Sequence, residues 1–100
     1  MKYKETPDIT LKMIIDTGII KPGAEVYASV NLEIVGHITN EGGILLSNGS
    51  EEILHPYPSG AARSVTKSSV NGWKFWLIKI GSDFQELRVI RELYRKKMEI

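Results

Sequence analysis

Turn residues divide residues 21–56 into short β-rich runs, and this division constrains the fold more than any other feature. Apolar residues alternate or cluster in four runs, at residues 26–30, 34–39, 44–46 and 53–55. Lys21-Pro22-Gly23-Ala24 fits a type II turn, and Asn48-Gly49 is among the strongest short-range signals for a hairpin. Each run therefore reaches its neighbour through a short turn, which predicts an antiparallel β-meander.

Helix signals precede and follow these runs. Thr10 or Asp8 can cap a helix whose apolar stripe begins at Leu11, and Gly18 can end it in a left-handed conformation. After the meander, Ser59 is expected to cap a short helix that runs to about Lys67. Two helices are therefore predicted, one on each side of the meander.

The last third of the chain predicts a strand and a helix. Asn71-Gly72 is typical of a tight turn, and residues 73–80 then alternate as a strand that is apolar on both faces and so central. Ser82, with Gln85 three residues later, resembles a capping box for a C-terminal helix. That helix has an apolar stripe made of Phe84, Leu87, Ile90, Tyr94 and Met98.

These elements predict an α+β fold. It consists of an antiparallel β-meander plus a later central strand, packed by an N-terminal helix, a short middle helix and a C-terminal helix. At 100 residues the chain is long enough for one compact core and too short for two, so residues 1–100 are expected to form a single domain.

Composition excludes several classes of protein. The chain has no cysteine, which rules out disulfides and thiolate metal sites. His37 and His55 lack the spacing of a helical metal site, and no nucleophile with a matching base is recognisable. No run approaches the roughly 20 apolar residues of a membrane span, and Met1 is followed by no secretory signal. We therefore expect a cytoplasmic chain without catalytic residues, metal, cofactor or membrane contact.

Charge is distributed unevenly along the chain. Residues 1–57 hold four lysines against eight acids, whereas residues 58–100 hold nine basic residues against four acids. The basic half either forms one electropositive face or is interleaved in space with the acidic half, and sequence position does not decide between the two.

A basic face next to aromatic residues favours nucleic-acid binding. Trp73 and Trp76 would point to opposite faces of a strand, so either both belong to the core or Trp76 stays partly open for a base to stack on. Ser59 is either a cap alone or part of a phosphate site, and Asn71 either sets a turn or contacts adenine. The candidate nucleic-acid-binding residues are Ser59, Arg63, Lys67, Asn71, Lys74, Trp76, Arg88, Arg91 and Arg95.

The order of motifs resembles the RAMA domain, the restriction/modification adenine methylase-associated module. The specific part is Asn71-Gly72-Trp73-x-x-Trp76 behind Pro58-Ser59-Gly60-Ala61-Ala62, and the matching features span about residues 10–95. Met13-Ile14-Ile15-Asp16-Thr17-Gly18, Ile20-Lys21-Pro22-Gly23, Gly42-Gly43-Ile44 and Leu87-Arg88 also fit, although they are generic.

The resemblance implies an accessory module found beside DNA methylases and nucleases. It implies binding to duplex DNA, plain or methylated, and sensing of modified bases in a restriction-modification or phage-defence setting. A methylase or nuclease subunit is the implied protein partner. The alternative is a protein–protein interaction module of a larger assembly without direct DNA contact, which the apolar last strand and the net charge of +1 also allow.

Overall fold

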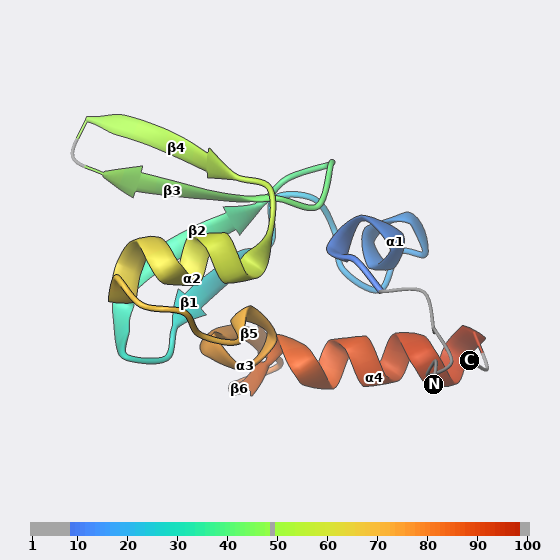
Figure 1. Ribbon diagram of the computed structural model, residues 1–100. Helices are drawn as coiled ribbons and strands as arrows, with labels where there is room; N and C mark the ends of the chain where they lie inside the picture. The colour runs from blue at the N-terminus through green and yellow to red at the C-terminus, as the bar shows by residue number, and fades with distance from the viewer. Residues whose placement is uncertain (1–8, 49, 99–100) are drawn as a thin grey trace, which may run out of the picture.

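The computed structural model describes residues 9–48 and 50–98. In this part of the chain, four helices and six strands follow one another in mixed order (Figure 1). They are α1 (Leu11–Asp16), β1 (Glu25–Ala28), β2 (Asn31–Ile38), β3 (Ile44–Asn48), β4 (Glu51–His55), α2 (Pro58–Thr66), α3 (Gly72–Phe75), β5 (Trp76–Ile80), β6 (Asp83–Glu86) and α4 (Leu87–Met98).

The strands form one antiparallel sheet in the order β4-β3-β2-β1-β5-β6. The predicted meander is β1 to β4, and its last hairpin pairs Asn48 with Glu51, as the Asn-Gly signal predicts. Gly49 itself, like Asp8, lies outside the described residues. β5 is an inner strand between β1 and β6. The α+β fold class is therefore confirmed.

One face of the sheet holds the core. Along β1, Val26 and Ala28 are buried while Tyr27 points to the opposite face. Helix α2 packs against β3 and β4, and α4 packs against β5 and β6. In Figure 1, α2 lies across the sheet and α4 runs from the end of β6 toward α1. The largest side chains that are almost fully buried are Trp76, Leu11, Ile14, Ile38, Ile44, Leu87 and Val26.

Helix α1 begins and ends as the sequence predicts. Thr10 is the N-cap, since its hydroxyl oxygen accepts a hydrogen bond from the Met13 N–H at 3.2 Å. Gly18 follows the helix with a φ of +86°, and Gly23 has the positive φ of a type II turn. The Ala24 N–H closes that turn by donating to the Lys21 carbonyl at 3.1 Å.

Helix α2 begins earlier than predicted. Its N-cap is Tyr57, which makes no side-chain capping bond, and Pro58 takes the first helical position. The expectation that Ser59 is the N-cap is therefore wrong. Proline is favoured at that position because its φ is already helical and its missing N–H would have no partner there.

The predicted strand over residues 73–80 is also wrong at its start. Asn71 has a φ of −77° and does not form a hairpin turn, because its side chain accepts a hydrogen bond from the Trp73 N–H at 2.9 Å. This local bond caps the short helix α3. The strand β5 begins only at Trp76, which pairs with Ala28.

Strand β6 is an element that the sequence pattern does not predict. Gly81 turns the chain with a φ of +64°, and residues 83–86 then pair with β5. Phe84 therefore belongs to the sheet, where its ring meets Tyr27 edge-on at 5.1 Å. Ser82 and Gln85 do not form a capping box, since α4 starts at Leu87. The rest of the predicted stripe divides into buried Leu87, Ile90 and Tyr94 and exposed Met98.

Candidate nucleic-acid interface

Two contacts with the Pro58 backbone join the two most specific motifs of the sequence. The indole Nε1 of Trp76 donates a hydrogen bond to the Pro58 carbonyl oxygen at 3.0 Å. A Cβ on Gly72 would lie 2.4 Å from the Pro58 carbonyl carbon, so only glycine allows this approach of α3 to α2. The start of α2 and the start of α3 are thereby held side by side.

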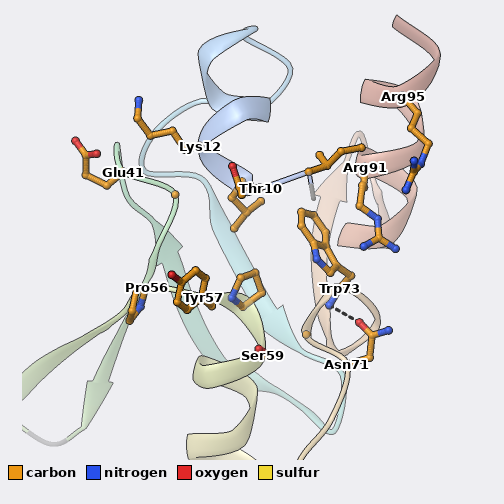
Figure 2. Close-up of a pocket in the computed structure, with 15 residues that line it drawn as sticks. Thr10, Lys12, Glu41, Pro56, Tyr57, Ser59, Asn71, Trp73, Arg91 and Arg95 are labelled. Atoms are coloured by element: carbon orange, nitrogen blue, oxygen red, sulfur yellow. Dashed lines mark hydrogen bonds between the residues drawn. The ribbon is translucent and has the colours of Figure 1, made fainter. Parts of the chain in front are cut away.

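A cavity of about 600 Å³ opens beside these two helix starts. Figure 2 shows Tyr57 and Ser59 on one side of it, Trp73, Asn71, Arg91 and Arg95 on the other, and Thr10 and Lys12 above. Its lining is completed by Ile9, Leu11, Glu41, Gly42, Pro56, Pro58 and Gly72.

Trp73 and Arg91 form the most specific contact in the cavity wall. The guanidinium carbon of Arg91 lies 4.8 Å from the centre of the Trp73 ring, within the range of a cation–π interaction. Within residues 9–48 and 50–98, Arg91 makes no ion pair, and its buried Nε has no hydrogen-bond partner. The wall therefore combines an aromatic ring with a cation.

The other cations of the wall are held by neighbouring carboxylates. Arg95 Nε lies 3.3 Å from a Glu92 oxygen, and Lys12 Nζ lies 3.2 Å from an Asp16 oxygen. Both pairs are largely exposed, so solvent screens them and neither is tight. Arg95 and Lys12 therefore remain open to a second anionic partner.

Residues 9–12 line the cavity on the side of α1. A Cβ on Gly42 would lie 2.5 Å from the Lys12 backbone nitrogen, and the φ of Gly42 is +87°. Glycine at this position lets the loop between β2 and β3 pack directly on the start of α1. The acidic first half of the chain thus contributes both Lys12 and Glu41 to the wall.

Four of the nine predicted binding residues meet at this cavity: Ser59, Asn71, Arg91 and Arg95. Arg63, Lys67, Lys74 and Arg88 lie outside its lining, and Arg88 pairs with Glu86 at 2.9 Å. Lys67 ends α2 on the side of the molecule away from the C-terminal end of α4 (Figure 1). The basic residues of the second half therefore do not all line this cavity.

Of the two alternatives for the tryptophans, the one that leaves Trp76 partly open is wrong. Trp76 is fully buried, with no exposed area, so a base cannot stack on it in this structure. Trp73 is half-buried and lines the cavity. A strand over residues 73–76 does not predict this position for Trp73, whereas the helical turn of α3 leaves its ring packed against the core and partly exposed at the cavity.

The adenine contact considered for Asn71 is also restricted. Its side-chain oxygen already accepts the Trp73 N–H, so one lone pair of that oxygen remains for a base. Its two amide hydrogens remain as donors. Asn71 thus holds the Trp73 backbone in place through its oxygen, and its amide N–H groups can donate to a ligand.

Two features are absent from the described ranges. No helix in the described ranges is long and apolar enough to cross a membrane. The same ranges contain no group of three or more histidine or carboxylate side chains that would hold a metal ion.

The fold and the cavity define a small α+β module that presents an aromatic ring among cations. A family model described as RAMA, Restriction Enzyme Adenine Methylase Associated, matches residues 2–99 of this chain. The chain therefore belongs to the RAMA family, as the motifs around Pro58 and Asn71 indicated. A search of curated proteins found no match.

Proposed function

We propose that this chain is a DNA-binding accessory module of a restriction-modification system and that it contacts DNA through the cavity formed by α1, α2, α3 and α4. The observation that carries the proposal is that Arg91 lies over the Trp73 ring in a cavity wall that also contains Arg95 and Lys12. Cations attract the phosphate backbone, and an aromatic ring offers a stacking surface to a base. In this proposal the chain binds DNA and performs no catalytic step.

The start of α2 supports phosphate contact at the same place. No side chain caps this helix, and Ser59, in its first turn, lines the cavity. Free N–H groups at a helix start favour an anion. The phosphate role considered for Ser59 thus rests on its backbone position at the second helical residue.

The experiment is a fluorescence-polarisation titration of a labelled duplex, plain or carrying N6-methyladenine, at two salt concentrations. Adenine methylation is the modification to test because the family description names an adenine methylase. We expect binding at low salt that weakens as salt rises, by close to one unit of log–log slope for each phosphate neutralised. Absence of binding to both duplexes at low salt would overturn the proposal.

Matched charge variants locate the interface. Arg95→Gln is expected to lower the log–log slope of affinity against salt by about 1. It should weaken binding to the plain and the methylated duplex equally. Lys67→Gln removes the same charge outside the cavity, and we expect it to leave the slope unchanged. An equal loss in both variants would show that the contact surface extends beyond the cavity, as the wider set Arg63, Lys67, Lys74 and Arg88 would require.

The alternative function is docking to a methylase or nuclease subunit without DNA contact. The sheet face opposite the helices favours it, because Leu54 and Phe84 are 55% and 39% exposed there. This alternative predicts no salt-dependent DNA binding by the isolated chain, so the titration above separates the two functions.

A further inference from the structure

The cavity raises the question of which part of DNA enters it. A volume of about 600 Å³ falls within the range of sites that enclose a small molecule. Paired bases in a duplex present only their edges in the grooves, and their ring faces are covered by stacking. Trp73 can therefore stack only on a base that has left the helix or has no partner.

The geometry around Trp73 suits such a base. Arg91 covers one face of the indole ring, and Figure 2 places Thr10 and Tyr57 on the side of Trp73 away from Arg91. The Asn71 side chain accepts a hydrogen bond from the Trp73 backbone N–H, and Arg91 covers the Trp73 ring. The backbone and the side chain of Trp73 are therefore both restrained. A ring fixed in this way loses little further freedom when a base stacks on it.

Cationic side chains near the Trp73 ring suit the phosphate of a nucleotide. The buried Nε of Arg91 has no hydrogen-bond partner in the described part of the chain, which is a costly state for a donor. Because Arg91 also lines the cavity, its guanidinium can donate to a phosphate or base oxygen there. Arg95, one turn further along α4, also lines the cavity and adds a second cation.

We propose that the cavity receives one unpaired nucleobase, which stacks on Trp73 while the attached phosphate faces Arg91 and Arg95. This inference rests on the DNA-binding function proposed above and specifies which structural state of DNA is bound. It predicts a preference for DNA in which a base is already unpaired, since the protein then spends no binding free energy on breaking a pair.

Three labelled duplexes of one sequence test the inference with the intact chain. The first is fully paired, the second has one mismatch, and the third has abasic sugars facing each other at that position. We expect the mismatched duplex to bind about 10-fold more tightly than the paired one. The doubly abasic duplex is as flexible but has no base to insert, so it should show no such gain.

Two Trp73 variants show whether the ring causes the preference. Trp73→Leu keeps an apolar side chain without a stacking face, so we expect it to bind paired and mismatched duplexes equally. Trp73→Phe retains a ring and should keep most of the preference. Circular dichroism checks that each variant is folded. If Trp73→Leu does not fold, the comparison of the three duplexes with the unmodified chain remains the test of base insertion.

Each other outcome has a distinct meaning. Equal binding of all three duplexes would overturn base insertion and leave the DNA-binding function standing. Tight binding of the doubly abasic duplex would also overturn it, because the preference would then reflect flexibility. Free deoxyadenosine monophosphate is a fourth probe. If the chain binds this nucleotide and none of the three duplexes, the DNA-binding function and base insertion are both wrong.

Discussion

Trp76 and Trp73 are three residues apart, and the backbone between them gives their side chains different roles. Trp76 begins β5, where its side chain enters the core and its Nε1 reaches the Pro58 carbonyl. Trp73 lies in α3, half-buried at the cavity. An indole N–H that is buried needs an acceptor, and the first residue of α2 supplies one.

Replacing Trp76 by phenylalanine tests this buried hydrogen bond. Trp76→Phe leaves the Pro58 carbonyl without its donor, so we expect the free energy of unfolding to fall by about 1–3 kcal/mol. Urea unfolding followed by circular dichroism measures the change. Trp73→Phe is the control, because Trp73 is partly exposed, and an equal loss in both variants would contradict the assignment.

Tyr27 makes a second residue-scale prediction, on the sheet face away from the helices. A hydrogen bond from its hydroxyl to Glu25 at 2.8 Å raises the pKa of Tyr27 above its ordinary value. A raised pKa means that the folded state holds the proton more strongly. The contribution of this group to stability is therefore complete below the ordinary tyrosine pKa and is lost as pH rises through the folded pKa.

Glu25→Ala removes both the acceptor and its negative charge, so we expect the pKa of Tyr27 to fall toward its ordinary value. An NMR pH titration of the tyrosine ring carbons measures it. Glu33→Ala, on the neighbouring strand, is the control, and an unchanged pKa in Glu25→Ala would show that the hydrogen bond is not the cause.

Between elements, the backbone approach of α3 to α2 holds the cavity wall together. Gly72 is buried and sits against Pro58 and Ser59, while Gly60 in α2 faces open space with nothing within 4 Å of an added Cβ. The two glycines thus provide a matched pair, since one is required by packing and the other is not.

Gly72→Ala is expected to lower the free energy of unfolding by about 1–3 kcal/mol, because the new Cβ meets backbone atoms that cannot rotate away. Gly60→Ala is expected to raise it by about 0.4–1 kcal/mol, since alanine restricts the unfolded chain and fits a helix. Thermal or urea unfolding of both variants measures these changes in the free energy of unfolding. A neutral Gly72→Ala would show that α2 and α3 separate easily.

On the scale of the whole molecule, one core connects every helix to the sheet. Buried residues of α1, α2 and α4, namely Leu11, Ile14, Ala61, Ala62, Leu87, Ile90 and Tyr94, belong to the same cluster as those of β1 to β3 and β5. No helix of the described chain therefore has a core of its own.

We accordingly expect a single cooperative unfolding transition. Tryptophan fluorescence, which reports on Trp73 and Trp76, and far-UV circular dichroism, which reports on all helices and strands, should give superimposable urea curves. An earlier transition in circular dichroism alone would show that one element, such as the short α1, unfolds separately.

Local chemistry explains which elements could be predicted. Thr10, Gly18 and Gly23 each act through bonds or dihedral angles within a few residues, and all three behave as the sequence indicates. Asn71 also acts locally, but its side chain can serve a turn or a helix cap, and only the bond to Trp73 distinguishes the two. Strand β6 depends on pairing with β5, for which no local signal exists.

The sequence alone determined the α+β class, the meander, the position of α1, the RAMA family and four of the residues that line the cavity. Tertiary structure decided the rest. It buried Trp76, left Trp73 partly exposed, and placed Lys12 and Glu41 from the first half in the wall of the same cavity as Arg91. The reason is physical: capping and turn preferences depend on neighbouring residues, whereas a cavity exists only where segments distant in the chain pack together.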